Sequence, residues 1–227
     1  MTAGRAPATP FELHEWRGSA EAFHARPIGD DARRSVWSFD VDAPAIVLGT
    51  RQSEADLDVD ACRAAGVDIV HRRSGGGAVL LRPAEVVWID VVVPSGDPLF
   101  EADVTRSMIW MGRRWVAALD ALGIGDADVH CGAMERTAIG ERLCFAGLGP
   151  GEVSIGGAKL VGISQRRTRH AARFQCAVHT LWDAAASVSL LATPHPAPAD
   201  VPPVAVLPAD VAAGLAPALA AVLGGGR

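Results

Sequence analysis

One amphipathic segment, from Asp103 to Leu122, constrains the fold most because it defines the best helix that the sequence predicts. Its apolar residues recur at three- and four-residue spacing, as on one face of an α-helix, and Gly123 marks its end. Such a stripe usually packs against a core rather than forming a binding surface. The stripe consists of Val104, Met108, Met111, Trp115, Leu119 and Leu122.

Short apolar runs, typical of strands, occupy much of the remaining chain. The predicted strands are Ser35–Phe39, Ala45–Leu48, Val67–Val70, Ala78–Leu81, Val86–Val93, Leu143–Ala146, Glu152–Ile155, Leu160–Ser164 and Phe174–Trp182. Weaker helices are predicted at Glu15–Ala25 and Asp58–Ala65. The two runs around residues 82–85 are expected to pair. These elements predict an α+β fold, a mostly antiparallel or mixed sheet packed with helices.

The chain is long enough for one such domain. Its 227 residues are 49% hydrophobic, which suffices to bury a core. We expect a catalytic domain over residues 10–192 and a Pro/Ala-rich C-terminal extension over residues 193–227. Six prolines between Thr193 and Pro208 predict a stiff strap, and the tail beyond it, interrupted by Pro217, predicts one or two helical turns.

Bulk properties exclude several functional classes. A net charge of -5 argues against nucleic acid as a general partner. The most apolar run, Val86–Pro94, is too short to cross a bilayer and contains Asp90, and Met1–Pro10 does not resemble a signal peptide. The cysteines lie far apart, which predicts neither zinc nor disulfides, so we expect a cytoplasmic protein without a metal or a membrane partner. They are Cys62, Cys131, Cys144 and Cys176.

Lys159 is the only lysine, although lysine and arginine together total 21. The abundance of alanine indicates a composition in which arginine replaces lysine wherever charge alone matters. A retained lysine therefore points to a role that the broad arginine fork cannot fill. Chance retention is the alternative.

A triple glycine follows the predicted strand at Val67–Val70, in the segment Arg72-Arg73-Ser74-Gly75-Gly76-Gly77-Ala78-Val79. Successive glycine N–H groups can converge on one anion, and Arg72 and Arg73 add charge-assisted donors. The segment lacks the Gly-Lys-Ser/Thr ending of a Walker loop and does not open a helix. A wide hairpin is the alternative, but three glycines exceed what a hairpin needs, so we favour contact with a ligand.

A second glycine-rich segment, Gly156–Ser164, contains the lysine. If Lys159 begins a strand, it shares one face with Val161, while Leu160 and Gly162 face the other way. We expect Gly157, Ala158 and Gly162 to border the ligand. In isolation, a solvent-exposed lysine at a strand end would be the simpler interpretation.

Taken together, these segments resemble the biotin/lipoate protein ligase superfamily, especially lipoate–protein ligase A and related single-domain octanoyltransferases. Residues 72–79 are similar to the ligand loop of the family, and residues 159–167 to its lysine strand. Residues 49–52 resemble its Gly-x-x-Gln turn, and Trp37 stands where the family often has an aromatic residue. The resemblance covers about residues 37–181 and implies the catalytic-domain fold of that superfamily.

The resemblance implies a lipoate–protein ligase that uses ATP with Mg²⁺. Lipoate, or a related medium-chain acid, would form lipoyl-AMP and then modify a lysine of a lipoyl domain. Acceptors would be E2 subunits of 2-oxoacid dehydrogenases and the glycine cleavage H protein, with a separate accessory subunit as a further partner. Lys159 would contact the carboxylate and α-phosphate, Gly75–Gly77 the acyl-phosphate region, and Arg72 the phosphates. Val79 and Leu81 would line an acyl tunnel.

Two other functions stay open. Single-domain octanoyltransferases of the superfamily place a nucleophilic cysteine in a Cys-Phe pair like Cys144-Phe145, which would make the protein a thioester-dependent transferase. An inert buried cysteine is the structural alternative. The family's His-Asp pair after the glycines is replaced here by Leu80-Leu81-Arg82-Pro83, which suits a non-catalytic ligand-binding member. Biotin ligase is a weaker fourth possibility.

The remaining histidines and tryptophans are more simply explained by packing. We expect His71 and His179 to be buried histidines with hydrogen-bond partners. The tryptophans expected in the core are Trp88, Trp110, Trp115 and Trp182.

Overall fold

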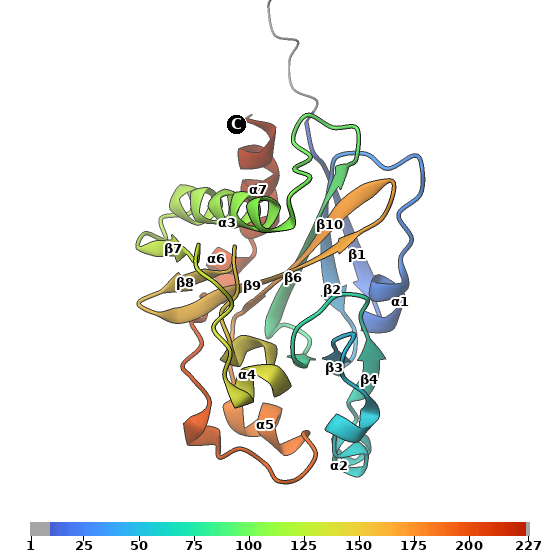
Figure 1. The fold of residues 1–227 in the computed structure, drawn as a ribbon, viewed down its shortest axis with the longest axis vertical. Coiled ribbons are helices and arrows are strands. Elements are labelled where there is room, and N and C mark those ends of the chain that lie inside the picture. Colours follow the sequence, from blue (N-terminus) through green and yellow to red (C-terminus); the bar gives the residue numbers. More distant parts are fainter. Residues whose placement is uncertain (1–9, 226–227) are drawn as a thin grey trace, which may run out of the picture.

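The computed structural model describes residues 10–225, in which two β-sheets are surrounded by helices (Figure 1). The strands are β1 (Glu12–Gly18), β2 (Ser35–Val41), β3 (Ala45–Leu48), β4 (Asp68–His71), β5 (Val79–Leu81), β6 (Val86–Pro94), β7 (Ala127–Val129), β8 (Val153–Ile155), β9 (Ala158–Arg167) and β10 (Ala171–His179). The α-helices are α1 (Ala20–Ala25), α2 (Val59–Ala64), α3 (Val104–Ala121), α4 (Ala138–Arg142), α5 (Ala184–Ser189), α6 (Ala209–Ala212) and α7 (Leu215–Gly224). Short 3₁₀ turns lie at Glu54–Asp56 (η1), Cys144–Ala146 (η2) and Pro198–Asp200 (η3).

The large sheet has the strand order β1-β2-β6-β10-β9-β8-β7, and the small sheet has the order β4-β3-β5. Among the described residues, the strands of the pairs β1–β2 and β3–β4 run parallel, and the other paired strands run antiparallel. The predicted α+β fold with a mixed sheet is therefore confirmed. No helix within residues 10–225 is long and apolar enough to cross a membrane.

Helices α3 and α7 pack against each other on one face of the large sheet (Figure 1). The buried face of α3 carries Met111, Trp115 and Leu119, as its sequence stripe predicted, and Asp103 caps its first turn. The stripe leaves the core at its N-terminal end, where Val104 is 54% exposed. Met108 is only partly buried, and both residues line a surface pocket described below.

The small sheet packs between the second face of the large sheet and the helices α2 and α5. Because side chains alternate along a strand, Val47 of β3 faces Phe39 and Trp88 of the large sheet, and Ile46 faces the cluster around α2 and α5. The predicted short helix is α2, capped by Asp58 and followed by Gly66 at a φ of 63°. The small sheet thus forms a layer of its own.

Two predicted elements and one predicted strand pairing were wrong. Glu15–Ala25 is not one helix: β1 pairs in parallel with β2, and α1 starts only after its N-cap, Ser19. Leu143–Ala146 is not a strand, because its backbone closes a 3₁₀ turn in which Ala146 N–H donates to Leu143 C=O. The runs around residues 82–85 do not pair with each other.

Strands β5 and β6 instead belong to different sheets. β5 pairs with β3, whereas β6 lies between β2 and β10 in the large sheet. Residues 82–85 are therefore a crossover between sheets, with Ala84 at a φ of 62°. Strand β6 is buried on both faces over most of its length, which explains its nearly continuous apolar sequence.

The C-terminal segment is integrated into the core rather than appended to it. Leu207, Leu215, Leu219 and Leu223 belong to the same buried cluster as Trp115. α7 is longer than the predicted one or two turns, because Pro217 lies in its first turn, where no helical N–H is required. The boundary predicted at residue 192 therefore does not divide the hydrophobic core.

Candidate active site

The triple-glycine segment forms the loop between β4 and β5, and Arg72 holds it from inside. The Arg72 side chain is buried, and its guanidinium donates to the carbonyl oxygens of Gly77 at 2.7 Å, Gly75 at 2.9 and 3.2 Å, and Val47 at 3.0 Å. Arg72 thus ties the loop to β3. A contact between Arg72 and a phosphate stays a prediction, since these four bonds are made within the chain.

The glycines allow this loop to pack closely against the segment that carries Cys144. Gly76 has a φ of 100°, and a Cβ there would lie 3.5 Å from the Cys144 sulfur. A Cβ on Gly77 would lie 2.8 Å from the main chain of Leu143. Ala78 N–H donates to Arg142 C=O, and Cys144 N–H donates to Ala78 C=O. Packing therefore explains Gly76 and Gly77, while a Cβ on Gly75 would meet no described atom within 4 Å.

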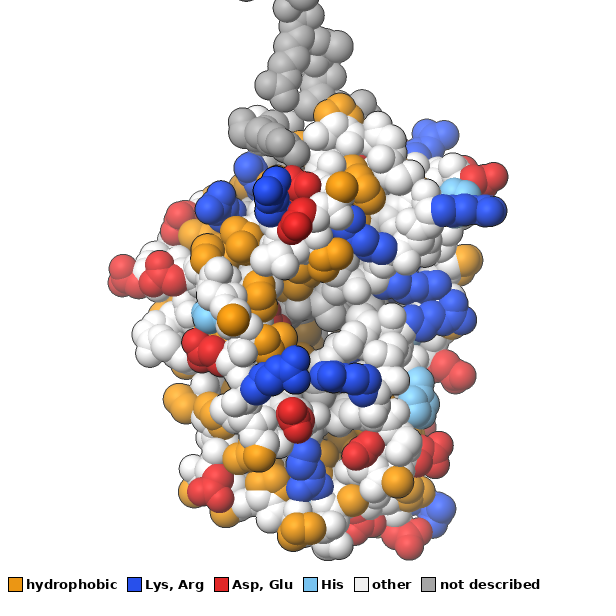
Figure 2. All heavy atoms as spheres, viewed as in Figure 1, with side chains coloured by type: hydrophobic (Ala, Val, Ile, Leu, Met, Phe, Trp, Pro, Cys, Tyr) orange, Lys and Arg blue, Asp and Glu red, His pale blue; other side chains and the backbone are white. Residues whose placement is uncertain are grey.

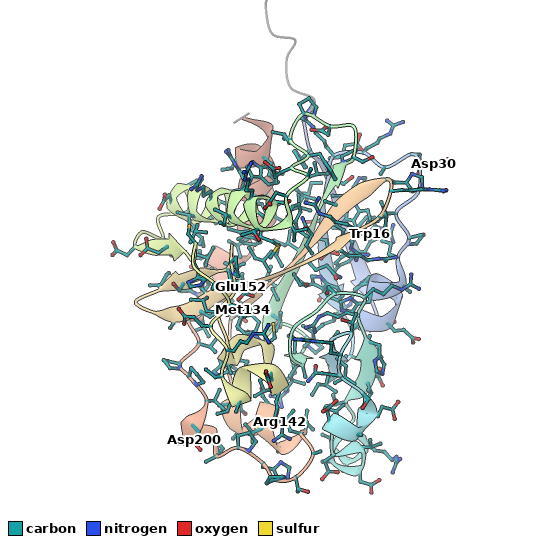
Figure 3. The ribbon with its side chains drawn as sticks, in the orientation of Figure 1. Trp16, Asp30, Met134, Arg142, Glu152 and Asp200 are labelled. Atoms are coloured by element: carbon teal, nitrogen blue, oxygen red, sulfur yellow. The ribbon has the colours of Figure 1, made fainter. Side chains whose placement is uncertain are left out.

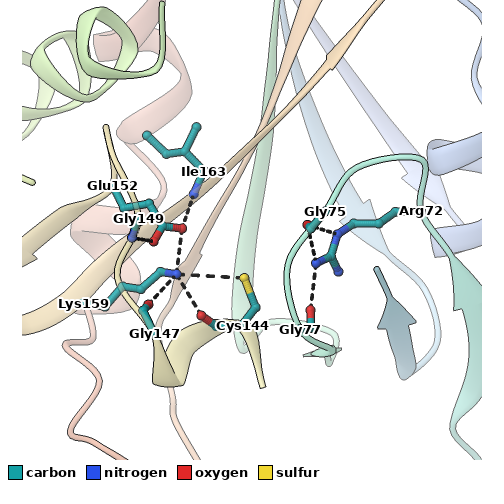
Figure 4. A network of polar contacts seen from close by, with 9 residues as sticks. All are labelled: Arg72, Gly75, Gly77, Cys144, Gly147, Gly149, Glu152, Lys159 and Ile163. Atoms are coloured by element: carbon teal, nitrogen blue, oxygen red, sulfur yellow. Dashed lines mark hydrogen bonds and ion pairs between the residues drawn. The ribbon is translucent and has the colours of Figure 1, made fainter. Parts of the chain in front are cut away.

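Lys159 lies near the start of β9, and its side chain is 4% exposed. Nζ is 2.7 Å from Oε1 of Glu152, and it donates to the carbonyl oxygens of Cys144 at 2.9 Å and Gly147 at 3.1 Å (Figure 4). The Cys144 sulfur is 3.9 Å from Nζ, on the side that faces the glycine loop (Figure 4). The lysine, the thiol and the loop therefore meet in one cleft, and an exposed strand-end lysine is excluded.

The predicted alternation along β9 fails at this point. The β8–β9 pairing has a register shift between Val153 and Ser154. A Cβ on Gly162 would lie 3.3 Å from Lys159 Cε and 3.0 Å from the Phe145 ring, so Gly162 lies beside the lysine chain rather than facing away from it. The irregular pairing breaks the strict period of two on which the prediction rested.

The charge of Lys159 is supported by its neighbours. Burial acts to lower the pKa of Lys159, but Cys144 and Glu152 outweigh it and raise that pKa above its ordinary value. Nearby His179 is buried, and desolvation followed by repulsion from Lys159 lowers the pKa of His179 to about 4. At neutral pH, the site thus contains an ammonium beside a neutral imidazole.

Cys144 stands where two pockets meet. Both pockets are lined by Cys144, Ile163 and Ser164. The inner pocket contains about 450 Å³ of atom-free space, part of which is open to solvent. Its lining is mainly apolar and comprises His24, Val47, Arg72, Val79, Leu81, Trp88, Cys144, Phe145, Gly162, Ile163, Ser164, Gln175, Cys176 and Ala177. An apolar chain attached to the Cys144 sulfur could enter this pocket.

A chain of polar side chains runs along the inner pocket. Ser74 donates to Gln175 Oε1 at 3.1 Å and is 3.0 Å from Ser164 Oγ, and Gln175 Nε2 lies 3.0 Å from His24 Nδ1. Burial, followed by repulsion from Arg72 and Arg173, lowers the pKa of His24 to about 3. The imidazole of His24, which lines the pocket, is therefore neutral at neutral pH.

The outer pocket is wider and opens to the surface. The space-filling view shows this face hollowed near its centre, with basic and apolar side chains beside the hollow (Figure 2). Arg51, Arg136, Met108, Met134 and Lys159 are among the residues that line the pocket. Figure 3 places Met134 and Glu152 together near the middle of the molecule. A second reactant could approach Cys144 from this side.

The structure brings together some predicted residues and leaves others apart. Lys159, Cys144, Gly75–Gly77, Val79 and Gly162 border the two pockets. Arg73 is exposed and lines neither pocket. Gly157 and Ala158 also line neither pocket. Gly157 instead forms part of the β8–β9 turn, with a φ of 81°.

Several packing expectations are corrected as well. His71 is exposed, and the Nε2 atom of buried His179 has no hydrogen-bond partner among the described residues. Trp88 and Trp115 are buried, whereas Trp110 and Trp182 are only partly buried. Cys176 is buried, and burial strongly raises the pKa of its thiol, as is typical of an inert core cysteine.

Sequence reasoning missed Glu152, the carboxylate that pairs with Lys159. It follows the turn Gly149-Pro150-Gly151, and nothing in that local pattern separates it from the other acidic residues. Gln175 and His24 were missed for the same reason, because each reaches the site only through the pairing of distant elements.

Comparison with protein families agrees with the fold. The lipoyl protein ligase A/B catalytic domain matches residues 19–213 of the chain. The chain belongs to this family. The match extends past residue 192, in agreement with the continuous core, and the family takes in both the ligases and the octanoyltransferases considered above.

Two curated relatives are octanoyltransferases. The chain is 32% identical over 135 residues to the octanoyltransferase LipM of Moorella thermoacetica, covering 58% of this chain and 46% of the relative. It is 26% identical over 114 residues to LipM of Clostridioides difficile, covering 50% and 41%. The chain thus matches less than half the length of either relative.

Solved structures of the family share the fold. A putative lipoate protein ligase from T. acidophilum with bound lipoic acid has a TM-score of 0.67 at 18% identity, covering 95% of this chain and 86% of that one. A lipoate-protein ligase A bound with ATP has a TM-score of 0.69 at 16% identity, with the same coverage. At these identities the likeness establishes the fold alone.

Proposed function

We propose that this member of the lipoyl protein ligase A/B family is a cysteine-dependent octanoyltransferase that moves an octanoyl group from a thioester to a lysine of a lipoyl domain. The observation that carries the proposal is the position of Cys144: its sulfur lies 3.9 Å from the Lys159 ammonium, where the inner and outer pockets meet. The LipM relatives support the same choice over an ATP-dependent ligase.

In the first step, the Cys144 thiolate attacks the carbonyl carbon of the octanoyl thioester. The buried ammonium places a positive charge beside the attacking sulfur and the carbonyl that it attacks, where negative charge is present during the reaction. The tetrahedral intermediate collapses with cleavage of the bond to the donor sulfur. The donor leaves as a thiol after protonation, and the octanoyl group remains on Cys144 as a thioester.

Main-chain groups are available for the carbonyl oxygen during this step. Within the described residues, the N–H groups of Gly75, Gly76 and Gly77 have no hydrogen-bond partner, and Gly76 adjoins the sulfur. The three donors of Lys159 already bond to Glu152, Cys144 and Gly147, so the lysine acts chiefly through its charge. The glycine loop would supply the directional hydrogen bonds.

In the second step, an acceptor lysine enters through the outer pocket. Its neutral amine attacks the Cys144 thioester, an amide forms, and the bond to the Cys144 sulfur breaks. The amine gives up a proton and the cysteine returns to its starting state, so the reaction needs no ATP. The inner pocket holds the octanoyl chain throughout, with Val79, Leu81 and Trp88 against it.

The ligase alternative fits the geometry less well. It assigns the phosphates of ATP to Arg72, but all of the guanidinium hydrogen bonds described above go to main-chain carbonyls. Besides Lys159, the cations that line the outer pocket and could meet a triphosphate are Arg51 and Arg136. A ligase would also have no chemical need for the thiol at the junction of the pockets.

The test is to incubate the protein with an octanoyl thioester of a phosphopantetheine arm and to follow its intact mass. We expect one octanoyl group on Cys144, and its transfer to a lipoyl domain added afterwards. Cys144→Ser should abolish both. Lipoate-dependent exchange between pyrophosphate and ATP that persists in Cys144→Ser would instead establish the ligase, and ligand binding without either reaction would indicate a non-catalytic member.

A further inference from the structure

Glu152 is a buried carboxylate that takes no part in the reaction steps above. Its side chain is 7% exposed, and Figure 3 shows it near the centre of the molecule. Oε2 accepts a hydrogen bond from Gly149 N–H at 2.7 Å, and Oε1 accepts one from Ile163 N–H at 3.1 Å (Figure 4). The carboxylate is thus fixed between the loop before β8 and the middle of β9.

The same carboxylate is the ionic partner of Lys159. Oε1 lies 2.7 Å from Nζ, whereas the other two oxygens bonded to Nζ belong to neutral carbonyls. Neutral carbonyls orient an ammonium but do not offset its charge, and a buried charge without a counter-ion is strongly unfavourable. Glu152 is therefore the group that can keep Lys159 protonated in the absence of a thiolate.

We propose that Glu152 is a positioning residue of the acyl-transfer site, whose fixed carboxylate keeps the Lys159 ammonium charged and aimed at the Cys144 thiol. The inference rests on the proposed function for its catalytic meaning. It explains why a carboxylate is held by two main-chain N–H groups at this place: a rigid carboxylate fixes both the position and the charge of the lysine.

Four groups around the ammonium determine its titration. Cys144 of η2 and Glu152 favour the charged lysine, and Arg72 of the glycine loop disfavours it. His179 of β10 is near enough for Lys159 to lower the pKa of its imidazole. Glu135, Arg136 and Glu141 line the outer pocket but make no described ion pair with Lys159. Removing the charge of Glu152 leaves burial and Arg72 against a protonated lysine.

The single lysine makes a direct measurement possible. Protein with a lysine-free tag, labelled with ¹³C only in lysine, gives one side-chain signal, from Lys159. We expect this signal to titrate in the wild type at or above the pH at which free lysine titrates in the same buffer. In Glu152→Gln, which keeps the shape but not the charge, it should titrate at lower pH than in the wild type. An unchanged titration would overturn the inference.

The rate of acyl-enzyme formation provides a readout that a purely structural role would not move. In Glu152→Gln, the alkaline limb of the pH–rate profile should shift to lower pH along with the lysine titration. On that limb the rate should fall at least about tenfold below that of the wild type, with a smaller difference near neutral pH. An equal loss at every pH, without displacement of the profile, would contradict the inference.

Asp97→Asn is the matched control. Asp97 also forms a buried ion pair, with Arg34 at 2.5 Å, and accepts a hydrogen bond from a main-chain N–H, that of Leu99. It lies in the loop after β6 and does not line either pocket. We expect this variant to lower the melting temperature without moving the lysine titration. A similar shift in both variants would show a general loosening and contradict the inference.

Two failures remain distinguishable. If wild-type protein forms no acyl-enzyme at Cys144, the proposed function fails, whatever the lysine titration shows. If Glu152→Gln does not fold, the wild-type titration decides, because a Lys159 that loses its proton well below free lysine has no effective counter-ion. A lysine that stays charged despite its burial supports Glu152, the carboxylate that contacts it.

Discussion

Two buried cations flank Cys144, and the fold holds them in opposite ways. Arg72 uses four of its five N–H groups in hydrogen bonds to carbonyls, whereas Lys159 has a carboxylate on one side and a thiol on the other (Figure 4). The planar fork of arginine suits the binding of several carbonyls at once, and the compact ammonium suits a place beside a reacting atom. The difference is consistent with the proposed roles, in which Arg72 builds the loop and Lys159 serves the chemistry.

The largest expected effect comes from replacing Cys144, the residue that lies between the two cations. Cys144→Ala should reduce octanoyl transfer by at least about a thousandfold, because the covalent intermediate can no longer form. Both cations should stay in place, since the sulfur makes only a long contact with Nζ. Transfer is measured by mass spectrometry of a lipoyl domain, and retention of activity would remove the proposed chemical role of the lysine as well.

Exchanging one cation for the other gives the next largest effect. Lys159→Arg should keep the fold and the charge but slow transfer by roughly a hundredfold or more, because a guanidinium cannot occupy the place of the ammonium. Steady-state transfer rates, compared with thermal melting, check this expectation. Near-normal turnover would mean that position 159 requires only a positive charge.

The converse exchange should act mainly on stability. Arg72→Lys cannot reproduce the fork that binds Val47, Gly75 and Gly77, so we expect a loss of about 3 kcal/mol in the free energy of unfolding. Urea unfolding measures this loss. If stability is unchanged while activity collapses, Arg72 contacts the substrate and the contrast between the two cations is wrong.

The smallest effect concerns His179, which lies beside the lysine. Its pKa is lowered from 6.5 to about 4, so the unfolded chain binds its proton first as the pH falls. Its contribution to stability is complete above pH 6.5 and is lost as the pH falls from there to about 4. At pH 5 the free energy of unfolding should have fallen by about 2 kcal/mol. His179→Phe should flatten this part of the stability–pH curve, with the slope from His24 remaining. An unaltered curve would show that His179 is not held neutral.

Much of the fold followed from local pattern. The spacing of Met111, Trp115 and Leu119 predicted α3, and strand β3 was predicted with its observed ends, Ala45 and Leu48. Pairing was harder, because nothing local to residues 82–85 distinguishes a hairpin from a crossover between sheets. The partner of β5 is decided by β3, more than thirty residues earlier in the chain.

The candidate site was predictable where a residue type was unusual. A lone lysine and a triple glycine stand out in the sequence, and the structure brings Lys159 and Gly75–Gly77 to one cleft. Glu152 does not stand out, since its importance comes from the distance to Lys159 and from the N–H groups of Gly149 and Ile163. Such a role depends on the tertiary structure and has no local signature.

The strap that follows α5 has a consequence for the site. Ala205 N–H donates to the carbonyl oxygen of Lys159 at 2.9 Å, and Leu207 N–H donates to that of His179 at 3.0 Å, just before α6 and α7 enter the core. The tail therefore holds the backbone at Lys159 in place through hydrogen bonds. Shortening the chain at residue 192 would release that backbone, so loss of the tail and loss of transfer should occur in a single cooperative event.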